Sequence, residues 1–255
     1  MNRKKKWYLI DRPDESAKYL QGWAIAGRHL QALFNQYNQK LSNPYTGFCW
    51  LRTQITSPTF DSMNFRFKNN VFSVQVDFVI DKNTRRGAFV SEKRKDLQVR
   101  ICENNDMIPC LFRIFVDDMT PMESGWNLRH TKTGEKIVPL DISDDSFKRV
   151  SKWELLHWGI AIVMDNLRKK GYKVLSFTDA PDVMPQLWFE DHSGNKCWVQ
   201  VIVNKPMSIA DFSETFPEEH MGYLAGVTIS PVEGEDVLYR SHPAEIEYKG
   251  LKKIC

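Results

Sequence analysis

The stretch KCWVQVIV at residues 196–203 follows the polar turn DHSGN and consists mainly of residues that favour β-strands. A second stretch, VFSVQVDFVI at residues 71–80, contains the same VQV string and follows the polar turn KNN. Each stretch is predicted to be a buried strand that forms a hairpin with the strand before it. The architecture follows from this hairpin, which occurs in both halves of the chain.

Similar elements surround the two hairpins. An amphipathic helix is predicted over residues 16–41, because apolar residues recur there at steps of three and four: Leu20, Trp23, Ile25, Leu30, Leu33, Phe34, Tyr37 and Leu41. Strands are predicted in the first half at GFCWLRTQI, MNFRF, VFSVQVDFVI, LQVRIC and PCLFRIFV.

The second half begins with a predicted helix over residues 143–171. Ser143 is a suitable N-cap, and the basic residues 168–170 followed by Gly171 are typical of a helix C-terminus. A short helix is expected at SIADFSETF. Strands are predicted at YKVLSF, PQLWFE, KCWVQVIV, GYLAGVTISP and DVLYRS.

The shared order of elements indicates an α/β (α+β) protein with two similar modules. Each module is predicted to be a long helix packed on a mixed β-sheet with a central hairpin. The modules span residues 1–116 and 150–255, and residues 117–149 connect them with one short strand at KIVPLDI. The alternative is that two ordinary hairpins share the VQV string by chance.

Composition indicates a globular chain, with 42% hydrophobic and 26% charged residues. The net charge of +3 is small for a protein that coats nucleic acid. The five cysteines form no CxxC pair, which disfavours a zinc ribbon and favours free thiols in a reducing compartment. No signal peptide and no apolar run long enough to cross a membrane are recognised, so a cytoplasmic protein is predicted.

Three segments of the second half carry a resemblance to a known superfamily: WELLHWGIAIVMDNLRKKGYKVL, APDVMPQLWFED and GNKCWVQVIVNK. Residues 150–205 resemble the core of the PD-(D/E)XK nucleases. That core has a helix with an early Glu, a strand that supplies an Asp and a strand that supplies Glu-x-Lys. The resemblance implies a site in which carboxylates hold Mg²⁺ and a lysine lies near the attacking water.

Most of the positions that the resemblance makes essential are degenerate in this chain. Glu154 matches the helix glutamate, but the strand aspartate falls near Gln186 or Leu187. The Glu-x-Lys position falls on Gln200 and Ile202, and in the first half on residues 75–77, which begin with Gln75. Because an amide and an isoleucine cannot replace a carboxylate and a lysine at a magnesium site, both modules are predicted to be inactive.

A Mg²⁺-dependent nuclease with relocated ligands is the alternative. Its candidate catalytic residues are Glu154, Asp182, Glu190 and either Lys196 or Lys205. The competing interpretation is that Glu190 and Lys196 lie at a solvated hairpin tip. No cofactor is expected unless this nuclease alternative holds.

A basic stretch at residues 82–95 is predicted to be a loop and provides a second alternative, nucleic-acid binding without catalysis. The candidate residues are Lys82, Arg85, Arg86, Lys93, Arg94 and Lys95. The simpler interpretation is that these charges keep the surface soluble. Neither a Walker loop nor a nucleophile elbow is present in the sequence, and no metal site is predicted.

These observations favour a protein that is not an enzyme. We expect an interaction or accessory protein of a bacterial multiprotein system, with a protein partner and with degenerate nuclease-like modules as its scaffold.

Overall fold

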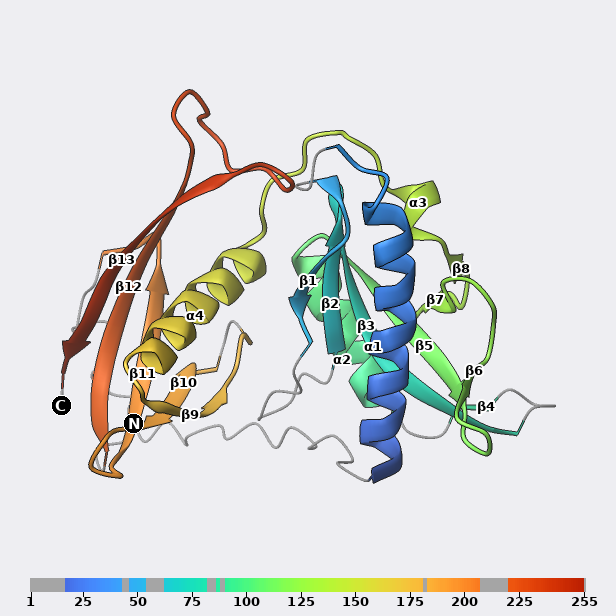
Figure 1. The fold of residues 1–255 in the computed structure, drawn as a ribbon, viewed down its shortest axis with the longest axis horizontal. Coiled ribbons are helices and arrows are strands. Elements are labelled where there is room, and N and C mark those ends of the chain that lie inside the picture. Colours follow the sequence, from blue (N-terminus) through green and yellow to red (C-terminus); the bar gives the residue numbers. More distant parts are fainter. Residues whose placement is uncertain are drawn as a thin grey trace, which may run out of the picture.

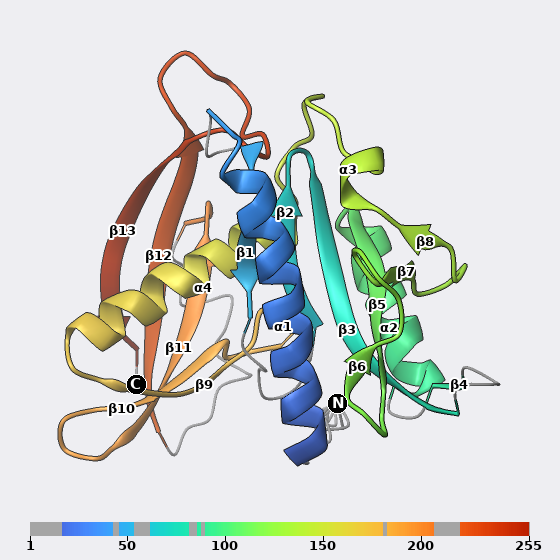
Figure 2. The same cartoon turned by 45° about the vertical axis from the view of Figure 1, so that its right-hand side comes forward.

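The computed structural model describes residues 17–42, 46–53, 62–81, 86–87, 90–180, 183–206 and 220–254. It contains two mixed β-sheets, and a long helix packs on one face of each (Figure 1). The predicted α/β class with two similar modules is therefore confirmed. Helix α4 packs on the second sheet, and its N-terminal end points toward β1 of the first sheet, as Figure 2 also shows.

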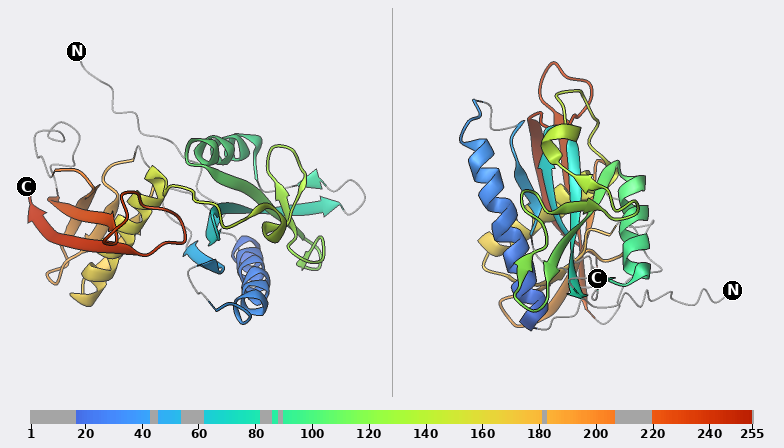
Figure 3. Two further views of the ribbon diagram at one scale, coloured as in Figure 1. Left: turned by 90° about the horizontal axis from the view of Figure 1, so that it is seen from above. Right: turned by 90° about the vertical axis from the view of Figure 1, so that its right-hand side faces the viewer.

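The first module is built on a sheet with the strand order β1-β2-β3-β5-β7-β8, and β4 and β6 pair with β3 and β5. Strands β1, β2 and β3 form an antiparallel meander, and β5 runs parallel to β3. Helices α1 and α2 lie on opposite faces of this sheet (Figure 3). The elements are α1 (Ala17–Asn38), β1 (Cys49–Arg52), β2 (Ser62–Phe67), β3 (Asn70–Asp81), β4 (Arg86–Gly87), α2 (Glu92–Asn104), β5 (Met107–Phe115), β6 (Thr120–Pro121), β7 (Leu128–His130), β8 (Lys136–Ile137) and α3 (Pro139–Ile142).

The second module has the strand order β13-β12-β11-β10-β9. Strands β9, β10 and β11 form an antiparallel meander, β12 runs parallel to β11, and β13 closes the sheet antiparallel to β12. The elements are α4 (Lys152–Lys169), β9 (Lys173–Phe177), β10 (Leu187–Glu190), β11 (Lys196–Val203), β12 (Met221–Pro231) and β13 (Ala244–Lys253). Both modules thus have a helix, a three-stranded meander and a strand parallel to its third strand.

The two VQV strings occupy equivalent places in the two modules. Their valines pack toward the long helix, α1 in the first module and α4 in the second. The central residues, Gln75 and Gln200, are buried and point to the opposite face, as strand alternation requires. Each glutamine lies beside a leucine of the parallel neighbour, Leu111 in β5 and Leu224 in β12.

A glycine brings each long helix close to its sheet at an equivalent position. Gly22 of α1 lies against Phe78, and Gly159 of α4 lies against Val203. Phe78 and Val203 are each the third residue after the central glutamine of the VQV string. The internal similarity therefore includes the contact between helix and sheet.

The buried stripe of α1 differs in part from the predicted one. Leu20 is largely exposed, although the spacing placed it in the core. The residues that face the sheet follow steps of three and four and include two small ones, which permit the close approach: Tyr19, Gly22, Ala26, Leu30 and Phe34.

Helix α4 begins later than Ser143, which was the predicted cap. The N-cap is Ser151, whose hydroxyl accepts from the Glu154 amide at 3.2 Å, while Glu154 Oε2 accepts from the Ser151 amide at 2.9 Å. The C-terminal end is confirmed, with Arg168 and Lys169 in the last turn and Gly171 at φ +79°. None of the described helices is long and apolar enough to cross a membrane.

Two strand predictions were wrong, and a third, KIVPLDI, is a strand only at Lys136–Ile137, because Pro139–Ile142 form α3. LQVRIC forms part of α2. Ser91 caps this helix, and Gln98 and Cys102, which lie one turn apart, form its buried face. DVLYRS contributes only an isolated bridge between Tyr239 and Arg149, and the closing strand is the more polar β13. The expected helix SIADFSETF lies outside the described residues. Residues 117–149 add β6, β7 and β8 to the first sheet and contain α3.

Alanine substitution in α1 tests the contact between this helix and its sheet. A methyl group at Gly22 would overlap the buried Phe78 ring, 2.8 Å from Cε1, whereas one at Gly27 would lie 3.7 Å from Met63 Sδ. We expect Gly22→Ala to lower the free energy of unfolding by about 1–3 kcal/mol. The matched Gly27→Ala should be neutral or raise it by up to about 1 kcal/mol through helix propensity. Equilibrium urea unfolding measures both, and equal changes in the two variants would contradict the proposed contact.

Candidate functional site at the junction of the two modules

Charged side chains are buried where the first sheet meets α4 and the segments around it. Arg52 at the end of β1 reaches toward the second module, and Arg240 from the connection between β12 and β13 reaches toward the first. Both arginines are nearly inaccessible to solvent. Since a buried guanidinium is stable only when its donors are paired, the junction depends on the partners of these two residues.

Arg240 forms an ion pair with Glu154, and both side chains are fully buried. Its Nε donates to the two carboxylate oxygens at 3.0 and 2.9 Å, and Nη2 donates to Oε2 at 2.7 Å. Glu154 also belongs to the N-terminal capping box of α4. One carboxylate therefore starts the helix and neutralises the arginine.

The remaining donors of Arg240 bind backbone carbonyl groups of the first module. Nη1 donates to Asn69 O at 3.2 Å and to Asp106 O at 2.9 Å, and Nη2 donates to Asn105 O at 3.1 Å. These carbonyls belong to the β2–β3 turn and to the α2–β5 turn. Arg240 thus joins two turns of the first module to the first turn of α4.

Arg52 forms the second network. Its Nη1 donates to Asp179 Oδ1, Nη2 donates to Ser62 Oγ at 2.7 Å and Nε donates to Ser62 O at 3.1 Å. The other oxygen of Asp179 lies 3.0 Å from His157 Nδ1, and His157 Nε2 lies 2.7 Å from Leu51 O. This network joins β1 and β2 to α4 and to the segment after β9.

Asp179 is ionised in this network. Complete burial acts to raise the pKa of its carboxyl, but the Arg52 charge and the hydrogen bond and charge of His157 outweigh burial and lower the pKa to about 2. Trp153 completes the arrangement, with its ring stacked on the His157 ring at 5.1 Å and the Arg52 guanidinium 5.8 Å from its centroid.

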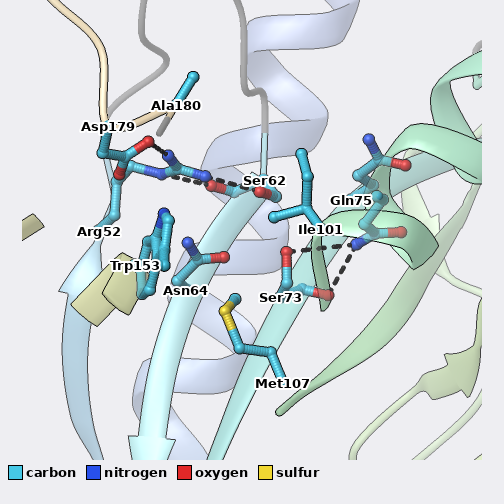
Figure 4. A pocket seen from close by; sticks show the side chains of 11 residues that line it. Arg52, Ser62, Asn64, Ser73, Gln75, Ile101, Met107, Trp153, Asp179 and Ala180 are labelled. Atoms are coloured by element: carbon cyan, nitrogen blue, oxygen red, sulfur yellow. Dashed lines mark hydrogen bonds and ion pairs between the residues drawn. The ribbon is translucent and has the colours of Figure 1, made fainter. Parts of the chain in front are cut away.

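A small polar cavity of about 20 Å³ lies beside Arg52 (Figure 4). Its walls come from β1, β2, β3, β5 and α2 of the first module and from Trp153, Asp179 and Ala180 of the second. Gln98 of α2 donates to Ser73 O at 2.8 Å and accepts from the Thr131 hydroxyl at 2.8 Å. A volume of this size holds about one water molecule and leaves no room for a substrate.

The positions that the resemblance would match to Glu-x-Lys lie on the sheet face opposite each long helix. In β11, Gln200 Oε1 has no hydrogen-bond partner in the part of the chain that the structure describes, and the nearby Ile202 is buried. Gln186 serves the sheet, since its Oε1 accepts from the Val201 amide at 2.9 Å. These three side chains present no carboxylate and no cation to a metal ion.

In the first module, buried Gln75 and Asp77 occupy the corresponding positions beneath α2. Burial raises the pKa of Asp77, and the charges of Lys95 and Arg113 oppose that rise. Arg113 Nε lies 3.5 Å from Asp77 Oδ2. A buried carboxylate therefore stands where the resemblance would place the lysine.

The residues of the nuclease alternative are not brought together. Glu190 and Lys196 face each other across the base of the β10–β11 hairpin, and Glu190 also lies 3.9 Å from Lys173 at the start of β9. Glu154 is in the first turn of α4, so most of that helix, about 20 Å at 1.5 Å per residue, separates it from this hairpin. Asp182 lies outside the described residues. Lys205 follows β11.

The basic residues of the nucleic-acid alternative do not form one loop. Lys93, Arg94 and Lys95 belong to the first turn of α2, where Lys95 binds Glu92 at 2.8 Å. Lys93 is exposed and Arg94 is half-buried. Arg86 belongs to β4, and Lys82 and Arg85 lie outside the described residues.

Among the described residues, no group of three or more His, Cys, Asp or Glu side chains could hold a metal ion. The junction residues Arg52, His157, Asp179 and Arg240 were not identified from the sequence. Glu154 is the one junction residue that the sequence analysis named, because it matches the helix glutamate of the nuclease core.

Residues 153–254 match a family model described as a domain of unknown function (DUF8840). The match extends from the first turn of α4 to the residue after β13 and thus coincides with the second module. Comparisons with curated proteins and with solved structures gave no match.

Removal of Arg240 tests the first network. Arg240→Met leaves Glu154 as an unpaired buried charge, so we expect a loss of about 3–5 kcal/mol in the free energy of unfolding. The double variant Arg240→Met/Glu154→Gln should be more stable than Arg240→Met, because the amide removes that charge and still accepts from Ser151. Lys132→Met, at an exposed pair with Glu103, serves as the control and should change stability by less than about 1 kcal/mol. Urea unfolding decides, and a double variant no more stable than Arg240→Met would contradict the role of the ion pair.

The second network predicts a pH dependence. Because the pKa of Asp179 is about 2 in the folded protein and 3.8 when unperturbed, its ionised form stabilises the fold above about pH 4. We expect this contribution, on the order of 2 kcal/mol, to disappear as the pH falls from about 4 toward 2. Urea unfolding of Asp179→Asn across this range should show a weaker decline in stability than the unsubstituted protein. Parallel pH profiles would argue against an ionised Asp179.

Proposed function

We propose that this protein is a non-catalytic interaction protein, an accessory component of a bacterial multiprotein system that uses two nuclease-like modules as a scaffold. The main observation behind this proposal is that Gln75 and Gln200 occupy equivalent buried positions. At these positions the PD-(D/E)XK superfamily would need a metal-binding carboxylate. A neutral amide is a weak ligand for Mg²⁺ compared with a carboxylate.

The use of Glu154 supports the same proposal. A catalytic carboxylate must reach a metal ion or a water molecule, but Arg240 takes both oxygens of Glu154 and the Ser151 amide takes one of them as well. A residue that is completely buried and paired in this way contributes to structure. We therefore propose that the resemblance extends to the order of elements but not to the chemistry.

The junction would give a partner a fixed surface. Arg52 and Arg240 each bind groups from both modules, so relative motion of the modules would break several buried charged hydrogen bonds at once. Two modules held in this way present surface residues at constant distances, which lowers the entropy lost when a partner binds.

An aromatic cluster beside the junction is the surface that we assign to the partner. Phe147 is 68% exposed, and its ring lies 5.2 Å from Tyr239 and 5.1 Å from His242. Exposed aromatic residues of this kind are enriched at protein interfaces, where a ring fills a pocket of the partner. The backbone of this region is held by the hydrogen bond from the Arg240 amide to Lys148 O at 2.8 Å.

Copurification from the native host, followed by mass spectrometry, tests this proposal. We expect a reproducible protein partner that is retained by Leu175→Ser, an exposed apolar position on β9, and lost with Phe147→Ser. Both are surface changes and should leave the melting temperature nearly unchanged. A chain that is always recovered alone would overturn the proposal.

A nuclease assay with DNA and RNA in Mg²⁺ or Mn²⁺ separates this proposal from catalysis. No cleavage is expected. Metal-dependent cleavage that Asp182→Ala abolishes would overturn the non-catalytic assignment and favour relocated ligands. Salt-sensitive gel shifts that charge reversal at Arg94 and Lys95 abolishes would favour nucleic acid as the partner.

A further inference from the structure

A second cavity lies on the other side of the Arg52 network, between β1 and α4. Its volume is about 160 Å³. One stripe of α4 forms its floor, because residues 157, 161, 164 and 168 recur at steps of three and four and so share one helix face. The first module contributes residues 51–53, and Phe177 of β9 completes the wall.

The ionisable side chains that line this cavity are all basic. They are Arg52, His157 and Arg168, and no acidic residue is among the lining residues. Asp179 contacts both Arg52 and His157, but it does not line this cavity. It lines the smaller cavity on the other side of Arg52. One negative charge therefore stands against three basic side chains.

Contacts with groups of both modules fix His157 in the cavity wall. Its Nε2 lies 2.7 Å from Leu51 O, and its Nδ1 lies 3.0 Å from Asp179 Oδ2. The Trp153 ring stacks on the His157 ring. His157 is therefore already paired within the protein.

Arg168 is the group still open to a ligand. Its side chain is exposed and makes no hydrogen bond or ion pair within the part of the chain that the structure describes. Its guanidinium stands at the end of the α4 stripe, next to walls supplied by Leu51, Ala161, Met164 and Phe177. The cavity thus combines an open cationic group with apolar surface.

We propose that this cavity binds a small monocarboxylic acid with a short aliphatic or aromatic body. The carboxylate pairs with the Arg168 guanidinium in the two-pronged geometry that suits these groups, and the body packs against Leu51, Met164 and Phe177. The volume is about five times the volume that one water molecule occupies in the liquid, roughly 30 Å³, which limits the ligand to a short chain or a single small ring. A phosphate fits less well, because it would leave the apolar walls unfilled.

Such a ligand would touch both modules, since β1 belongs to the first and α4 and β9 to the second. Its binding would therefore add contacts across the junction and raise the stability of the docked arrangement. The proposal does not depend on the identity of any protein partner.

Titration with benzoate, followed by protein NMR chemical shifts, tests the site, with benzamide as the uncharged analogue of the same shape. We expect saturable benzoate binding in the millimolar range, shifts centred on α4 and β1, and at least tenfold weaker binding of benzamide. Arg168→Gln should weaken benzoate binding at least tenfold. Lys170→Gln, an exposed cation at the same helix end that does not line the cavity, should leave it unchanged.

A variant that fills the cavity tests the binding site without changing any charge. Ala161→Leu places a larger side chain in the cavity floor and should abolish benzoate binding, while the melting temperature shows that the protein remains folded. Benzoate binding that is equal in Arg168→Gln, binding that survives Ala161→Leu, or the absence of saturable binding would each overturn the proposal. A peptide carboxylate that binds where benzoate does not would also overturn it.

Discussion

A buried guanidinium imposes the strongest constraint in this molecule, because every donor that leaves water must find an acceptor. Arg240 meets this requirement with two carboxylates and three backbone carbonyl groups drawn from three separate segments. Those acceptors converge only when the β2–β3 turn, the α2–β5 turn and α4 are all in place. The arrangement of the modules is therefore coupled to the completeness of each one.

The surroundings of the two equivalent glutamines show that the modules share a chain topology but differ in the side chains on one face of the sheet. In each module, the valines beside the glutamine pack on the long helix, and a helical glycine contacts the same relative position of the third strand. The opposite faces of the two sheets differ. In the first module this face carries polar groups and Asp77 beneath α2, and in the second it carries Gln200 between the large apolar residues Trp198 and Ile202.

Local patterns predicted the strands well and the long-range contacts poorly. KCWVQVIV matches the bounds of β11, since alternation and a preceding turn are encoded within a few residues. LQVRIC has the composition of a strand but lies in α2, because the Ser91 cap and burial against β5 outweigh strand propensity. Arg52 and Asp179 are 127 residues apart, and no periodicity in a single sequence relates such residues. Of the buried charged residues at the junction, only Glu154 was singled out from the sequence.

The position of Arg240 along the chain has a consequence for biosynthesis. The ribosome makes Arg240 171 residues after Asn69 and 86 residues after Glu154, so the turns and the helix that it binds emerge long before it does. Until then Glu154 has no guanidinium to neutralise it, and the carbonyls of the two turns remain hydrated. The Arg240 network is thus the later of the two to be completed during translation, since every residue of the Arg52 network precedes Arg240 in the chain.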